Sequence, residues 1–140
     1  MACYREASAL PAALVHPSIA GRVIPLFASG DRDTAVLSAF RAVEIAVRQA
    51  AKWDEKKFGV RMMQEAFNPD RGVLTDRALP MTEREAEQAL FAGAFGHGRN
   101  PVNHRDLNMG PVEAARLILL ASHLLTIVEK RLAGQENPDA

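Results

Sequence analysis

The sequence has a single cysteine and no excess of charge of either sign. Cys3 cannot form a disulfide within the chain, and its place near the N-terminus gives it no catalytic or metal-binding context. Seventeen basic residues balance seventeen acidic residues, which excludes the broad positive field with which sequence-independent nucleic-acid-binding proteins hold phosphates. Any contact with nucleic acid is therefore expected to be local.

No export signal or membrane-spanning run is recognisable. Arg5 and Glu6 near the N-terminus are not followed by a long apolar core. The most apolar stretch, residues 117–125, contains Ser122 and His123 and is shorter than the roughly 20 residues that span a bilayer. Together with the lone cysteine, these features predict a soluble cytoplasmic protein that makes no membrane contact.

Patterns typical of metal and nucleotide sites are missing too. The histidines and carboxylates do not recur at close zinc-ligand spacings such as His-x-x-x-His. Residues 93–98 are rich in glycine but lack the Gly-x-x-x-x-Gly-Lys-Ser/Thr pattern that cradles phosphates. We expect no metal and no cofactor.

The periodicity of apolar residues predicts an all-α fold, a compact bundle of four to five helices. A chain of 140 residues suffices for one domain, and no run shows the sustained alternation of a half-buried strand. We expect a domain over residues 14–133, preceded by an extension over residues 1–13 and followed by a disordered tail over residues 134–140.

Two helices are expected in the first third of the chain. The first begins at residues 16–18 and extends to Gly30, with Pro25 expected to kink or interrupt it. The second begins near residue 31 or 33 and ends around Trp53. Its buried seam is predicted to consist of Val36, Phe40, Val43 and Val47, and its outer face of Arg41, Glu44 and Arg48.

Three further segments complete the predicted bundle. A shorter apolar segment over residues 62–67 follows Gly59 and is closed by Asn68-Pro69, and a loop is expected over residues 70–80. Thr82 and Glu85 form a capping-box pattern at the start of the next helix, which the glycines at residues 96 and 98 end abruptly.

The last helix begins at Gly110-Pro111 and frays near Gly134. It is apolar around much of its circumference, so one bundle is not expected to cover it completely. Either it is the central helix, or a second copy of the chain buries part of it. We expect a homodimer.

Polar side chains gather at the helix break over residues 96–106, which we interpret as a candidate active-site loop. A turn in which Asn100 and Asn103 cap the chain, while Arg99 and His104 bond exposed helix ends, would suit the same residues. The spacing of Arg99 and His104 does not distinguish these two interpretations, because Arg116 and His123 form a similar pair within a continuous apolar helix. A structural role is expected for that second pair.

Residues 99–104, with the sequence Arg-Asn-Pro-Val-Asn-His, resemble the Arg-polar-x-x-x-His motif of the HEPN superfamily. Four further blocks, which lie in the same order, are similar to the uncharacterised bacterial Ymh-type hypothetical proteins, a branch usually grouped with HEPN. These blocks cover residues 14–19, 59–67, 91–94 and 99–101. The resemblance extends over about residues 14–132 and implies an all-helical, usually dimeric protein, often a ribonuclease.

The resemblance implies metal-independent cleavage of RNA, in which the ribose 2′-hydroxyl attacks the adjacent phosphate. His104 would transfer protons, Arg99 would stabilise the developing negative charge, and Asn100 would orient the phosphate or His104. Turn formation or capping is an equal possibility for Asn100. His97, Asn103 and Arg105 are the candidate substrate-binding residues.

Two residues outside this loop have open roles. His16 is shared with the Ymh-type proteins, and a helix-entry group that bonds the backbone is expected rather than a catalytic one. Trp53 lies among lysines at a solvated helix end, although it could instead stack on a nucleic-acid base. The methionines at residues 62 and 63 and Phe67 are expected in the core.

The leading hypothesis is a HEPN-type endoribonuclease that acts as a toxin or phage-defence effector. Its partners would be a second copy of the chain, an RNA substrate, and an antitoxin or other component of a defence system. The rival hypothesis is a non-catalytic helical dimer that acts as a binding or regulatory module. The two differ in what Arg99 and His104 do.

Overall fold

A computed structural model describes residues 9–54, 56–99 and 108–136. Over these residues the protein is built from five α-helices and two short helical segments, without a strand. The elements are η1 (Ala12–Leu14), α2 (Pro17–Ala28), α3 (Arg32–Ala51), α4 (Gly59–Ala66), α5 (Met81–Ala94), η2 (Phe95–Arg99) and α7 (Pro111–Glu136). The predicted all-α bundle is confirmed.

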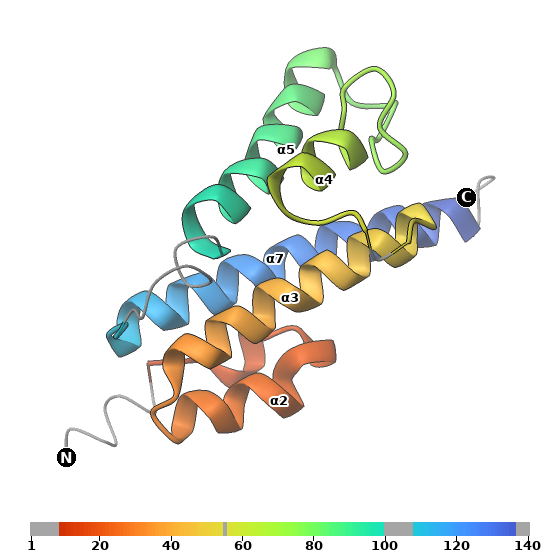
Figure 1. Ribbon diagram of the computed structural model, residues 1–140. Coiled ribbons are helices and arrows are strands. Elements are labelled where there is room, and N and C mark those ends of the chain that lie inside the picture. Colours follow the sequence, from red (N-terminus) through yellow and green to blue (C-terminus); the bar gives the residue numbers. More distant parts are fainter. Residues whose placement is uncertain (1–8, 55, 100–107, 137–140) are drawn as a thin grey trace.

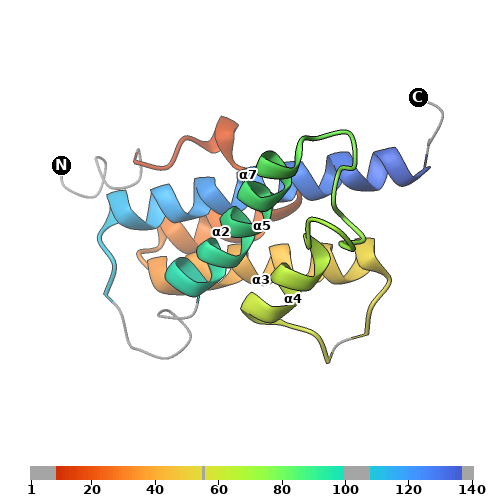
Figure 2. The same cartoon turned by 90° about the horizontal axis from the view of Figure 1, so that it is seen from above.

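Helices α3 and α7 form the centre of the molecule. They lie side by side, with α2 on one side and the α4–α5 pair on the other (Figures 1 and 2). The four predicted seam residues of α3, Val36, Phe40, Val43 and Val47, are fully buried. Burial of side chains of this size contributes about 1.5–3 kcal/mol each, so α3 is the main organising element of the core.

The last helix is the central helix that its composition suggested. By length and composition alone, Pro111–Gln135 could cross a membrane. One side of α7 is nevertheless buried in the bundle, through Ala114, Ile118, Ala121, Leu124 and Val128. Four of its other apolar side chains, Leu117, Leu119, Leu120 and Ile127, are only partly buried.

Proline does not interrupt α2, contrary to one of the two expected effects of Pro25. The helix continues to Ala28 with Pro25 inside it. A proline removes the hydrogen bond to the carbonyl four residues earlier, which in α2 belongs to Gly21. Because Gly21 is exposed, water can satisfy its carbonyl.

The capping box predicted for α5 is wrong. The helix begins at Met81, so Thr82 lies inside the first turn, and Pro80 is the N-cap without any side-chain cap bond. Arg84 determines this start instead, because its guanidinium donates to the carbonyls of Leu79, Arg77 and Pro69. The side chain thereby ties the preceding loop around the first turn of α5.

The end of α5 also differs from the expected abrupt stop. The α-helix ends at Ala94, but the chain continues as the π-helical segment η2 to Arg99. Phe95 within η2 is fully buried and meets Phe40 edge to face, with ring centroids 5.6 Å apart. This aromatic contact holds η2 on the central helix α3.

Candidate functional site

The candidate active-site loop begins at a well-packed segment. Arg99 is the last residue of η2, whereas Asn100, Asn103, His104 and Arg105 lie outside the described residues. The structure shows the chain on either side of these residues.

Gly98 lies just before the loop, at a position where the neighbouring side chains leave no room for a Cβ atom. A Cβ atom at this position would lie 2.9 Å from Cζ of Phe40 and 3.5 Å from Cδ2 of Leu117. The backbone of η2 therefore lies directly on one side chain from α3 and one from α7. His97, the preceding residue, is exposed, as a substrate-binding or a merely solvated histidine would be.

The exit from the loop is fixed by Met109, whose side chain is buried. Its backbone N–H donates to Oδ1 of Asp33 at 3.1 Å, and its carbonyl accepts from Nε of Arg32 at 2.7 Å. Both partners lie in the first turn of α3. Each end of residues 100–108 is thus anchored on α3, at Phe40 and at residues 32–33.

Replacing Gly98 by alanine should destabilise the protein by about 1–3 kcal/mol, because Phe40 is fully buried and has little room to move. Gly93→Ala is the matched control, since Gly93 is a helical residue with open space around its Cβ position. That control should be neutral or stabilising by up to about 1 kcal/mol. Urea unfolding measures both, and equal midpoints would contradict the packing described for η2.

A buried carboxylate on α3 is the most significant residue that the sequence pattern misplaces. Glu44 is predicted on the outer face, but its side chain is only 3% exposed. One of its oxygens accepts a hydrogen bond from the backbone N–H of Gly59 at 2.8 Å. Glu44 lies one helical turn after Phe40, on the side of α3 that contacts η2 and α4.

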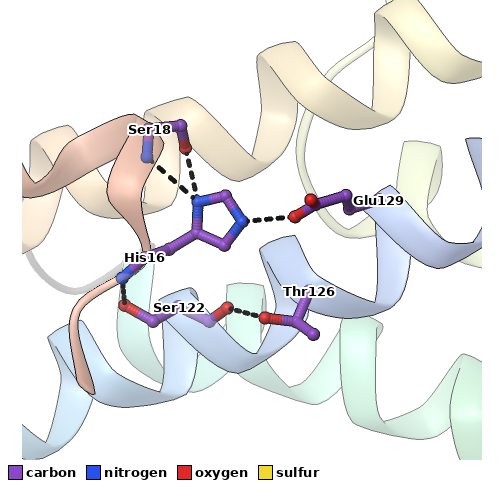
Figure 3. A network of polar contacts seen from close by, with 5 residues as sticks. All are labelled: His16, Ser18, Ser122, Thr126 and Glu129. Carbon is purple, nitrogen blue, oxygen red and sulfur yellow. Dashed lines mark hydrogen bonds and ion pairs between the residues drawn. The ribbon is translucent and has the colours of Figure 1, made fainter. Parts of the chain in front are cut away.

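The ring of His16 caps α2 and connects it to α7 (Figure 3). Its Nδ1 accepts from the backbone N–H of Ser18 at 3.1 Å and lies 2.8 Å from the Ser18 hydroxyl. Because a backbone N–H can only donate, Nδ1 carries no proton, and Nε2–H donates to Glu129 at 2.6 Å. The expected role of His16 as a helix-entry group is confirmed.

The backbone of the same residue is tied to α7 by a buried serine. The N–H of His16 donates to Oγ of Ser122 at 3.1 Å (Figure 3). The same hydroxyl donates to the carbonyl of Ile118 at 2.9 Å. Ser122, which interrupts the apolar stretch of α7, therefore has its polar atom satisfied. This network holds the start of α2 against the central helix.

The second Arg–His pair lies on the surface. Arg116 and His123 are both exposed on α7. Among the described residues, no three histidine, cysteine, aspartate or glutamate side chains are grouped so that they could hold a metal ion.

These features define a small all-α protein in which a polar loop joins η2 to the central helix α7. The model of one protein family, described as a protein of unknown function (Hypoth_ymh), matches residues 13–128. The chain belongs to this family, as the resemblance at its N-terminal and central blocks predicted. No curated protein and no solved structure matches the chain.

Proposed function

We propose that this protein is a metal-independent endoribonuclease of the HEPN type. The observation that carries the proposal is that the described residues on either side of the Arg99 to His104 motif, Gly98 and Met109, are held on α3. The motif starts where η2 ends on Phe40, and the chain after it is bound by Arg32 and Asp33. Catalysis needs groups held within a narrow range of positions, and a loop fixed at both ends supports that requirement.

The proposed reaction is an internal displacement at phosphorus. The ribose 2′-oxygen loses its proton to a base and bonds to phosphorus, while the 5′-oxygen leaves and takes up a proton. The products end in a 2′,3′-cyclic phosphate and a 5′-hydroxyl. His104 suits the proton transfers, because imidazole titrates near neutral pH.

Charge stabilisation falls to Arg99 in this proposal. A guanidinium stays protonated and presents a planar fork of donors that matches phosphate oxygens. Asn100 orients the phosphate or His104, and His97, Asn103 and Arg105 bind the flanking RNA. The exposure of His97 on η2 is compatible with that role.

A homodimer would complete the site. One Arg–His pair supplies one proton-transfer group, whereas the reaction uses a base and an acid. Two-fold symmetry brings two such pairs together. The partly buried apolar residues of α7, together with Val112, which is 52% exposed, offer apolar surface for a second copy.

The biological role follows from the HEPN resemblance. We propose a cytoplasmic toxin or phage-defence effector that cuts RNA and is restrained by an antitoxin or another component of a defence system. The rival proposal remains a non-catalytic helical dimer that binds or regulates a partner. Only the first requires His104 to be chemically active.

The test is incubation of the purified protein with total RNA in EDTA. We expect fragments that end in 2′,3′-cyclic phosphate from the wild type and intact RNA from His104→Ala. Gel filtration at decreasing protein concentration should show the dimer dissociating. The cleavage rate per protomer should fall over the same range of concentrations. Intact RNA with both proteins would contradict the nuclease proposal and favour the binding module.

A further inference from the structure

An open groove beside α4 carries a combination of side chains that no function assigned above uses. The groove has a volume of about 820 Å³, within the range of small-molecule binding sites. It is lined by residues from the end of α3, helix α4, the following loop and α5. Six of its lining residues bear groups that can bind a ligand: Trp53, Arg61, Gln64, Asn68, Arg71 and Gln88.

Trp53 is the aromatic element of the groove. The indole packs partly against the core, and the ammonium of Lys57 lies over its ring, 4.3 Å from the centroid. The preceding residue, Lys52, has a φ of 59°, in the left-handed region that residues other than glycine seldom adopt. That conformation turns the chain back so that the N–H of Trp53 bonds the carbonyl of Arg48.

The cations of the groove have no partner within the part of the chain that the structure describes. Arg61 and Arg71 are exposed, and neither guanidinium makes a hydrogen bond or ion pair there. By contrast, Arg84 and Arg131 bind carbonyls of the neighbouring loop. The groove's one lining carboxylate, Glu65, is paired with Lys57 at 2.5 Å.

Amide groups line the floor between the two arginines. The Gln88 side chain donates to the carbonyl of Gln64 at 2.8 Å, and Oδ1 of Asn68 accepts from the N–H groups of Asp70 and Arg71. These bonds fix two of the amides in place. The side-chain amide nitrogen of Asn68 and the Gln64 side chain make no hydrogen bond with other described residues.

We infer that this groove binds a single-stranded RNA segment, with a base on Trp53 and phosphates on Arg61 and Arg71. An aromatic ring accepts any unpaired base, arginines neutralise phosphates, and amides bond base edges. An apolar ligand would make no use of the two guanidinium groups. A base on the same face of the ring would displace the Lys57 ammonium from the indole, and a cation–π contact at an exposed site is weaker than base–aromatic stacking.

Helix α4, which lines the groove, also contacts the segment that leads to the proposed cleavage loop. A Cβ at Gly96 of η2 would lie 3.8 Å from Cγ2 of Val60, and Arg61 is the next residue of α4. The groove and the element that ends at Arg99 therefore share one neighbouring helix, α4. This inference rests on the proposed ribonuclease function and supplies its substrate class, single-stranded RNA.

The first test is titration of the full chain with a short 2′-O-methyl oligonucleotide. This probe lacks the attacking hydroxyl, so binding is measured without cleavage. Trp53 is the sole tryptophan, and its emission should change saturably. Two phosphate contacts predict that log K falls with log salt concentration with a slope of about −1.4.

Matched variants locate the binding. Arg61→Gln and Arg71→Gln should each weaken binding about tenfold and reduce the salt slope by about 0.7. Arg41→Gln removes an exposed arginine on the α2 side of α3 and should leave both unchanged. With a labelled oligonucleotide read by anisotropy, Trp53→Ala should weaken binding about 5- to 100-fold, and Trp53→Phe much less. Thermal melts confirm that each variant is folded.

The outcomes separate this inference from the proposed function. RNA cleavage by a protein that shows no saturable emission change would overturn the groove as the RNA site and leave the nuclease standing. Equal losses with Arg41→Gln and Arg61→Gln, or equal affinity for a poly-glutamate peptide, would also overturn it. Oligonucleotide binding with the predicted variant pattern but no cleavage supports the groove and counts against the nuclease.

Discussion

Replacing His104 by alanine should slow RNA cleavage about 10²- to 10⁴-fold, the usual contribution of a positioned acid–base group. Arg99→Lys should cost a similar 10²- to 10³-fold, because a lysine keeps the charge but cannot present two parallel donors to a phosphate. Single-turnover cleavage of a labelled RNA in EDTA measures both. Neither change should shift the Tm of a properly folded protein by more than a few degrees.

The chain provides its own control for this experiment. Arg116 and His123 form a second Arg–His pair, and both are exposed on α7. His123→Ala should leave the cleavage rate unchanged. Equal losses with His123→Ala and His104→Ala would show that the motif at residues 99–104 has no special role.

Gly72→Ala should destabilise the protein more than Gly98→Ala does, with a cost of about 3 kcal/mol or more and a fall in Tm of roughly 10 °C. A Cβ at this position would lie 2.3 Å from Oγ1 of Thr75, 2.5 Å from N of Asn68 and 2.6 Å from O of Ala66. Two of these three atoms belong to the backbone, so a side-chain movement cannot relieve the overlap. Thermal unfolding followed by circular dichroism measures the loss.

The same substitution should open the loop after α4. Asn68 organises this loop, because its carbonyl accepts from the N–H of Gly72 and from the Thr75 hydroxyl. Gly21→Ala, at an exposed helical position with open space, is the control and should not destabilise the protein. A normal melting curve for Gly72→Ala would contradict the loop geometry described above.

The central helices could be predicted from the sequence because their burial depends on local spacing. Val36, Phe40, Val43 and Val47 follow one face of a helix, and a helix with that seam has few other ways to pack. The start of α2 could also be predicted from the sequence, because the helix-start signal lies in two adjacent residues, His16 and Pro17. Local chemistry is sufficient in both cases.

The incorrect predictions concern positions whose structure depends on residues distant in the sequence. Glu44 is a charged residue of the predicted outer face, but it follows Phe40 by one helical turn and is buried, where it accepts a hydrogen bond from the N–H of Gly59, 15 residues later. Thr82 and Glu85 satisfy the capping-box pattern, yet Arg84 positions the helix start through loop carbonyls. Such long-range hydrogen bonds leave no periodic trace in the sequence.

For the candidate site, the sequence indicates where the polar loop lies but not how it is supported. The glycines of residues 96 and 98 suggest a helix end, whereas Gly98 instead allows the backbone to rest on Phe40. The sequence around Trp53 is compatible with either solvent or nucleic acid against its ring. The two arginines of the groove come from α4 and from the loop after it, so their grouping with Trp53 depends on the tertiary fold.

The π-helical form of η2 affects the rotation about the helix axis at which this segment ends. A π-turn accommodates an additional residue compared with an α-turn, and each residue of an α-helix corresponds to about 100° of rotation. The five residues of η2 therefore act as a phase shift at the end of α5. A regular α-helix would place the backbone of residue 99 at a different rotation about the helix axis, so the wider turn of η2 determines the position on the bundle at which α5 and its extension end.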